Sequence, residues 1–120
     1  MDSKLFFRAR VVHSILLGKS EEALELLSQH YNVAVPKLRV GLPKGFAESL
    51  GCYVAKNGMI HVLNRENMCS PYVIVHEFYH HLRTHGREHK GTEKHAKRFA
   101  EEFLRAYELF QSTTEQQDED

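Results

Sequence analysis

Apolar residues recur at intervals of three and four along the first third of the chain, which is the spacing of one face of an α-helix. Residues 4–17 show this pattern, with apolar side chains near one face at Leu5, Phe6, Ala9, Val12 and Leu16. A second helix is expected to begin at Ser20, because serine is a good N-cap and the two acidic residues that follow it complement the helix dipole. It should end near Asn32. The pattern therefore predicts two N-terminal helices.

The middle third of the chain carries the short apolar runs that are typical of β-strands. Residues 38–40 form one such run. Two more, Cys52–Lys56 and Met59–Leu63, flank the pair Asn57-Gly58, which is the strongest short-range signal for a β-hairpin. We therefore expect a small sheet of about three strands that includes this hairpin.

Two longer helices are predicted in the last third of the chain. The first has Ser70 as its N-cap and Pro71 in the first helical position, and it runs to about Thr84. Apolar residues surround it on nearly every side, so we expect it to be buried. The second can be capped by Thr92 and has one apolar face, formed by Ala96, Phe99, Ala100, Phe103, Tyr107 and Phe110. Helices combined with a separate hairpin-containing sheet predict an α+β fold.

The length and the charge of the chain restrict its class. Its 120 residues provide one domain, which we place at residues 1–110. The last ten residues, Q-S-T-T-E-Q-Q-D-E-D, contain no basic and no apolar side chain, so residues 111–120 are predicted to form a disordered acidic tail. Sixteen basic residues balance sixteen acidic ones, which excludes a histone-like basic protein and a polyanionic chaperone.

The compartment is inferred from signals that the sequence does not contain. No run approaches the roughly 18 apolar residues that a membrane helix needs. His13 interrupts the apolar stretch near the N-terminus, which argues against a signal peptide. Cys52 and Cys69 are too few for a disulfide framework. We therefore expect a cytoplasmic protein with free thiols and no membrane partner.

A chemically specific pattern lies inside the predicted buried helix, where residues 76–80 read H-E-F-Y-H. Because successive residues of an α-helix are about 100° apart, His76 and His80 differ by only about 40° and project from one face. Both imidazoles can therefore reach one metal ion, with Glu77 beside it. The spacing is that of the H-E-x-x-H zinc-peptidase motif, in which the histidines bind zinc and the glutamate is the general base.

A catalytic zinc site takes three protein ligands and leaves one position for water. The extended three-histidine form of the motif needs Gly at position 83 and His at position 86, but the chain has Arg83 and Gly86. The other common solution is a glutamate at the start of the next helix, and Glu93 lies about 60° from the centre of that helix's apolar face. Glu93 is therefore the preferred third ligand, and the alternatives are His85, Glu88, His89 and His95.

Taken together, His76, Glu77 and His80, a short loop and the segment E-K-H-A-K-R-F-A from Glu93 to Ala100 resemble the gluzincin peptidases. The second segment is similar to the ImmA/IrrE-type branch, and the short chain is similar to the single-domain minimal gluzincins. The resemblance implies a minimal zincin-like fold, with a small twisted sheet whose edge strand borders the cleft, an active-site helix and a glutamate helix.

Two features depart from that family pattern. Lys97 stands where related families often have an Asp or Asn that steadies a zinc-binding histidine. The family reaction also needs a donor to the oxyanion, and the sequence offers only the weak candidates His61, His81 and Tyr107. Full activity would therefore depend on support from other residues.

The resemblance implies a zinc metalloendopeptidase with one zinc ion. The residue chemistry supports hydrolysis as well, because zinc lowers the pKa of its bound water toward about 7 and Glu77 can accept the proton. We expect a peptide or protein substrate that binds in extended form along Met59–Leu63, as an added β-strand. The acidic tail suggests a latent enzyme in which tail carboxylates fold back onto the site, although a solubilising tail is the simpler interpretation.

Two other classes stay open. The first is a catalytically silent, zincin-like binding or regulatory module. The second is a metal-dependent, nucleic-acid-associated hydrolase, which is suggested by basic residues close to the predicted site at Arg83, Arg87, Lys90, Lys94, Lys97 and Arg98. Charge runs usually form solvated faces, so we do not expect a nucleic-acid partner.

Overall fold

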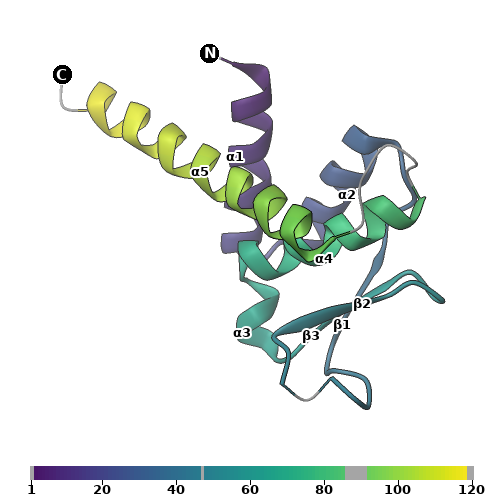
Figure 1. Cartoon of the computed structure of the whole chain (residues 1–120). Coiled ribbons are helices and arrows are strands. Elements are labelled where there is room, and N and C mark those ends of the chain that lie inside the picture. Colours follow the sequence, from purple (N-terminus) through teal and green to yellow (C-terminus); the bar gives the residue numbers. More distant parts are fainter. Residues whose placement is uncertain (1, 47, 86–91, 119–120) are drawn as a thin grey trace.

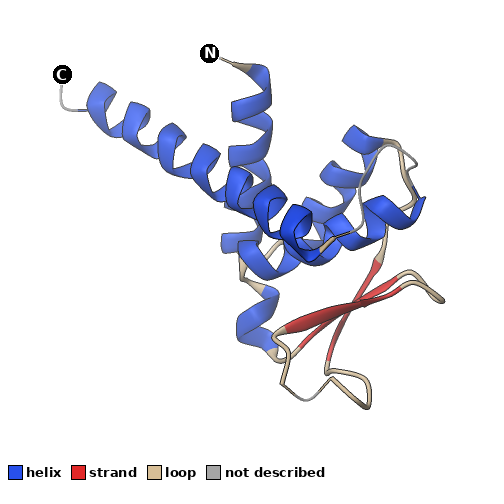
Figure 2. Cartoon of the chain, viewed as in Figure 1, coloured by secondary structure: helices blue, strands red, loops and turns tan. Residues whose placement is uncertain are grey.

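The longer helices and the sheet of this chain occupy opposite sides of the molecule, and a short helix lies beside the sheet (Figure 2). The computed structural model describes residues 2–46, 48–85 and 92–118. In this part of the chain, five helices and three strands form the expected α+β arrangement. In chain order they are α1 (Ser3–Leu16), α2 (Ser20–Tyr31), β1 (Lys37–Val40), β2 (Gly51–Val54), β3 (Met59–Val62), α3 (Arg65–Met68), α4 (Pro71–His85) and α5 (Glu93–Asp118).

The caps predicted for α4 and α5 are confirmed. Ser70 Oγ accepts a hydrogen bond from the Val73 N–H at 3.4 Å, one turn into α4. Thr92 Oγ1 accepts one from the His95 N–H at 3.2 Å, one turn into α5. Such bonds satisfy backbone donors that have no partner inside the helix. The starts of both helices are therefore fixed by their own local sequence.

The structure differs from the sequence-based prediction at α2 and α3. Lys19 occupies the N-cap of α2 and Ser20 is its first helical residue. The Ser20 hydroxyl instead donates a hydrogen bond to the Met68 carbonyl, which ties α2 to α3. Helix α3 was not expected, because four residues are too few to show a hydrophobic period. Asn64 caps it by accepting a hydrogen bond from the Asn67 N–H at 3.0 Å.

Helix α1 buries a wider and rotated face compared with the predicted one. Val11 and Ile15 are fully buried, whereas Phe6 and Leu16 are about half exposed. The reason is tertiary, because α1 contacts α2, α4 and α5 rather than a single neighbour. A one-faced periodic pattern anticipates only one such partner.

The sheet has the strand order β1-β3-β2 and confirms the predicted hairpin. β2 pairs antiparallel with β3, with Gly51 opposite Val62 and Val54 opposite Met59. Gly58, at the end of the turn, has a φ of 62°, in the left-handed region that glycine adopts readily. β1 pairs in parallel with β3 on the other side. In the described sheet, β3 is thus paired on both edges and β2 has a free edge.

Helix α4 lies between the sheet and the helices α1, α2 and α5 (Figure 1). Its predicted burial is confirmed, because buried side chains lie on most of its sides. The largest fully buried side chains of the core come from α4 itself and from α1, α2, α5 and β3, and they include Phe78, Phe103, Ile15, Leu24, Leu27 and Ile60. The core therefore surrounds the helix that carries the H-E-x-x-H pattern.

Helix α5 begins beside α4 and extends away from the sheet (Figure 1). Residues 111–118, which were predicted to belong to a disordered tail, continue this helix, and residues 119–120 lie outside the described residues. Glu and Gln are good helix formers, and extending an existing helix is far easier than starting one. None of the helices described in this chain is long and apolar enough to traverse a lipid bilayer.

Candidate metal centre

Three side chains from α4 and α5 converge on one point. The Nε2 atom of His76 lies 3.1 Å from Oε2 of Glu93, and the Nε2 atom of His80 lies 2.7 Å from Oε1 of Glu93. One ligand atom from each of these residues lies within 4.8 Å of the other two. The structure thus brings together the three residues predicted as metal ligands, in a group that could hold a metal ion.

The two histidines are placed by helix geometry and the glutamate by packing. The rings of His76 and His80 lie one turn apart on α4, with 5.2 Å between their centroids. Glu93 is the first residue of α5. Farther along α5, the Phe99 ring packs on Tyr79 of α4 at 5.0 Å. This contact holds the start of α5 over the histidine face of α4.

The donor set fits a tetrahedral metal site. Ligand bonds of about 2.0–2.1 Å separate neighbouring ligand atoms by about 3.3 Å in such a site. The two histidine–glutamate distances, 3.1 and 2.7 Å, are about 0.2 and 0.6 Å shorter and involve the two different carboxylate oxygens. Hydrogen bonds from the imidazoles to the carboxylate account for this shorter spacing. In a metal-bound site, coordination would replace these hydrogen bonds.

The outer nitrogens of the two imidazoles lack the acceptors that metal-binding histidines usually have. Nδ1 of His80 accepts a hydrogen bond from Nε of Arg83 at 3.0 Å, so the proton of the neutral ring is on Nε2. Nδ1 of His76 is buried and has no hydrogen-bond partner among the described residues. Lys97, at the position where related families often have Asp or Asn, is exposed. The three candidate ligands are therefore together, but among the described residues no hydrogen-bond acceptor orients the two imidazoles.

Burial changes the protonation of two residues at the cluster. It lowers the pKa of His80, partly offset by the Glu93 carboxylate, and so favours the neutral imidazole that binds metals. Burial also raises the pKa of Glu77 to about 7, and the charge of Glu93 adds to this shift. Only 8% of Glu77 is exposed. Its carboxyl group can therefore gain or lose a proton near neutral pH.

The cluster lies in a cleft of about 590 Å³ between α4, α5 and β2. His76, Glu77 and His80 line it from α4, and Glu93 lines it from α5. On the opposite side, three consecutive residues of the edge strand, Gly51–Tyr53, form a wall. An extended ligand in this cleft would thus lie between β2 and the metal ligands.

Two contacts hold β2 against α4. A Cβ atom at Gly51 would lie only 2.7 Å from Cγ1 of Val73, so the close approach of the strand requires glycine. Two residues later, the Tyr53 hydroxyl donates to Nδ1 of His81 at 2.7 Å, while Nε2 of His81 donates to the Ala34 carbonyl at 2.7 Å. These contacts set the width of the cleft.

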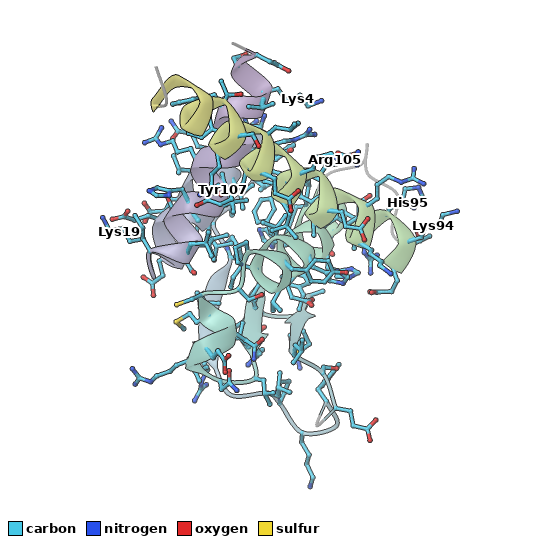
Figure 3. The ribbon with its side chains drawn as sticks, turned by 90° about the vertical axis from the view of Figure 1, so that its left-hand side faces the viewer. Lys4, Lys19, Lys94, His95, Arg105 and Tyr107 are labelled. Atoms are coloured by element: carbon cyan, nitrogen blue, oxygen red, sulfur yellow. The ribbon has the colours of Figure 1, made fainter. Side chains whose placement is uncertain are left out.

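The two alternative third ligands that the structure describes, His85 and His95, are not at the cluster. The His85 ring packs on His81 instead, with 4.5 Å between centroids, on the Tyr53 side of α4. His95 hydrogen-bonds to Thr92 and projects outward from the start of α5 (Figure 3). Glu88 and His89 lie outside the described residues.

None of the three oxyanion candidates lines the cleft. Nδ1 of His61 pairs with the Gly41 carbonyl at 3.0 Å, and His81 is engaged by Tyr53. Tyr107 accepts a hydrogen bond from Gln111 at 2.9 Å, farther along α5. The polar residues other than the metal cluster and Glu77 that do line the cleft include Ser49, Tyr53, Tyr72, Arg83 and Thr84.

The predicted substrate strand, Met59–Leu63, needs correction. β3 is hydrogen-bonded to β1 on one edge and to β2 on the other, so it has no free edge to offer. The strand at the cleft is β2. The sequence predicted which two strands form the hairpin, but not which of them β1 covers, because that depends on the tertiary path of the chain.

From the sequence, Arg83 was expected near the site only as one of several basic residues, and not as a residue that lines the cleft. Arg83 lies seven positions after His76, which is two helical turns to within about 20°, so both residues share one face of α4. A helical-wheel argument would therefore have found it. Gly51 is different, because its role depends on a helix that follows much later in the chain.

No protein-family model, curated protein or solved structure matches the chain. The functional argument therefore depends on the residues of the cleft and on their geometry.

Proposed function

We propose that this chain is a zinc-dependent metallopeptidase, with His76, His80 and Glu93 as the zinc ligands and Glu77 as the general base. The observation that carries this proposal is the convergence of three ligand atoms within 4.8 Å of one another, beside a buried glutamate. Two imidazoles and one carboxylate are a ligand set that catalytic zinc uses, with a fourth position open to water.

The chain's own residues provide the remaining chemistry. When bound, zinc would polarise the scissile carbonyl and lower the pKa of the attacking water. The Glu77 carboxylate accepts a proton from this water and delivers it to the nitrogen of the leaving amine. In the metal-free chain, burial raises the pKa of the Glu77 carboxyl to about 7, so this group is able to take up and to release a proton near neutral pH.

The substrate is proposed to bind as an extended strand on the free edge of β2. Main-chain N–H and C=O groups of an edge strand can pair with any peptide in extended form. Exposed Phe46 and Leu50, just before β2, give this side of the cleft an apolar surface for side chains. The proposal therefore favours a peptide substrate over a small polar one.

Metal analysis of the purified chain, together with a peptide-library cleavage assay, tests the function. We expect about one zinc ion per chain, and cleavage that a chelator removes and added zinc restores. Glu77→Gln should retain zinc and lose at least about a hundredfold in rate. His76→Ala should lose zinc as well as activity, whereas His95→Ala, next to the cluster but outside it, should lose neither.

Two results would contradict the proposal. A zinc-loaded chain that cleaves no peptide in the library would indicate the silent binding module instead. Cleavage that survives chelation, or that Glu77→Gln leaves unchanged, would place the activity outside this cluster.

A further inference from the structure

Arg83 is the cationic group that lines the cleft beside the metal cluster. Its Nε atom donates to Nδ1 of His80 at 3.0 Å. Within the described part of the chain, no carboxylate lies within 4.0 Å of its guanidinium group. An arginine presents five donors, and a carboxylate is the partner that matches its geometry. Arg83 is thus a cation in a cleft with most of its donors available.

The contact between Arg83 and His80 cannot persist when His80 binds a metal as a neutral ring. A neutral imidazole has one proton, so a ring that binds through Nε2 carries its proton on Nδ1. Nδ1 would then be a donor facing the Nε donor of Arg83. The guanidinium group must therefore leave His80 when the site is loaded, and the cleft is the space next to it.

The other end of the cleft has the opposite character. Phe46, Leu50, Tyr72 and Val73 line it, at the start of α4 and just before β2. Arg83 and Thr84 line it near the end of α4. The metal cluster lies between these two groups along the helix. An extended peptide would consequently meet an apolar surface on one side of the cluster and a cation on the other.

The direction of β2 determines whether the N-terminal or the C-terminal part of a bound peptide lies at Arg83. Gly51 lies against Val73, and Tyr53, two residues later, bonds to His81. β2 and α4 therefore run in the same sense, from the apolar end of the cleft to the Arg83 end. A peptide paired antiparallel with β2, the slightly more stable arrangement, runs the opposite way. Its N-terminal part would lie at Arg83.

We infer that Arg83 is a specificity-determining residue, which binds an acidic side chain on the N-terminal side of the scissile bond. This inference rests on the proposed peptidase function. Because Arg83 can bind the carboxylate through two parallel hydrogen bonds, Lys at this position would recognise it less well. The apolar end of the cleft would accept the residues that follow the scissile bond.

Peptide binding to the zinc-loaded Glu77→Gln chain tests this directly, because this variant should bind without cleaving. The probes are N-acetylated, C-amidated peptides in which a single Glu or Gln is moved along one neutral sequence. We expect Glu to bind about tenfold more tightly than Gln at one position. Adding Arg83→Met should abolish the preference, and Arg83→Lys should restore part of it. Arg105→Met, an exposed arginine farther along α5, is the matched control and should keep it in full.

Two further measurements could overturn the inference. Zinc affinity, measured by competition with a chromophoric chelator, should be no weaker in Arg83→Met than in the unchanged chain. A tenfold loss would show that Arg83 supports His80 and does not serve the substrate. A peptide with a free C-terminal carboxylate should bind no better than its amide, and a preference for the free acid would identify that terminus as the ligand.

The outcomes separate this inference from the proposed function. Cleavage by the unchanged chain with equal binding of Glu and Gln peptides would reject the role of Arg83 and leave the peptidase intact. An Arg83-dependent preference for Glu without any cleavage would reject the peptidase and retain the binding role. We expect the cleaved bond to lie on the C-terminal side of the preferred Glu. A cleaved bond on the N-terminal side of that Glu would overturn the assignment.

Discussion

The α1–α2–α5 side of the molecule and the α4–β2 cleft differ in what they bury. The buried residues of α1, α2 and α5 are apolar, apart from two serines of α2. The buried titratable residues of the described chain are Cys52, His61, Glu77, Tyr79 and His81, and all five lie on β2, β3 or α4. The same fold thus contains an apolar helical core and, next to it, a region where ionisable groups are removed from water.

This difference shows where stability is gained and where it is given up. Removing an ionisable group from water is unfavourable, and such groups gather where chemistry requires them. Glu77 has its pKa raised to about 7, and Nδ1 of His76 has no hydrogen-bond partner among the described residues. The apolar packing of the helical side offsets the unfavourable free energy of burying these groups. Variants on the two sides should therefore behave differently.

The largest effect on stability is expected on the helical side. Phe103 is fully buried, and its ring packs on Phe99 at 5.0 Å and on Phe7 at 6.3 Å. Phe103→Ala should lower the free energy of unfolding by about 3–5 kcal/mol. Urea denaturation measures this change, with the exposed Leu109→Ala as the control. At a temperature where the variant is folded, its zinc affinity should stay within about twofold, and a larger loss would show that the two sides are coupled.

On the cleft side, the free energy of unfolding of the metal-free chain is expected to change by about 3 kcal/mol with pH. The folded-state pKa of Glu77 is raised from 4.5 to about 7. Below pH 4.5 the group is protonated in both states. Between pH 4.5 and about 7, the Glu77 carboxyl is ionised in the unfolded chain but still protonated in the native state, so the native state loses stability as the pH rises. Above about pH 7 this loss is complete. Glu77→Gln does not titrate, so its stability relative to the unchanged chain should rise over this interval.

Urea unfolding at several pH values between 4.5 and 8 measures this difference for the metal-free proteins. Distant titrating groups are common to both chains and cancel in the comparison, whereas Glu93, whose charge adds to the Glu77 shift, is coupled to the substitution. Glu22→Gln, an exposed position of α2, is the control. A constant difference between Glu77→Gln and the unchanged chain would mean that Glu77 is not held in a desolvated site.

A smaller effect is expected where β2 approaches α4. Gly51→Ala would place a Cβ 2.7 Å from Val73 Cγ1 and 3.1 Å from the His61 carbonyl oxygen, and should lower the free energy of unfolding by about 1–3 kcal/mol. It should also weaken peptide binding, because the strand would move. In a double-mutant cycle, Val73→Ala should remove part of the penalty, and strict additivity would show that the two residues do not clash.

Removal of the acidic C-terminus should have the smallest effect. Helix α5 carries Asp118 about 38 Å along its axis from Glu93, in the direction away from the sheet (Figure 1). A chain ending at residue 110 should therefore match the full chain in zinc affinity and in rate. A faster truncated chain would revive the latent enzyme suggested by the sequence, and would require the end of α5 to unwind.

Local features of the fold could be predicted from the sequence because their causes are local. The hairpin around Asn57-Gly58, the caps at Ser70 and Thr92 and the burial of α4 all follow from short segments. Helix α3, the rotated face of α1 and the helical end of α5 were not predicted. They depend on neighbours or on helix extension, which hydrophobic periodicity does not report.

For the candidate site, the spacing of His76 and His80 along the chain was enough to place both on one face, since the period of an α-helix fixes this regardless of the remaining chain. It also favoured Glu93, but the meeting of its carboxylate with both imidazoles required α5 to pack across α4. The tertiary structure alone made β2 the edge strand that borders the cleft, and it buried Glu77 enough to raise its pKa. Strand order and desolvation arise from contacts between distant segments, and no local pattern encodes them.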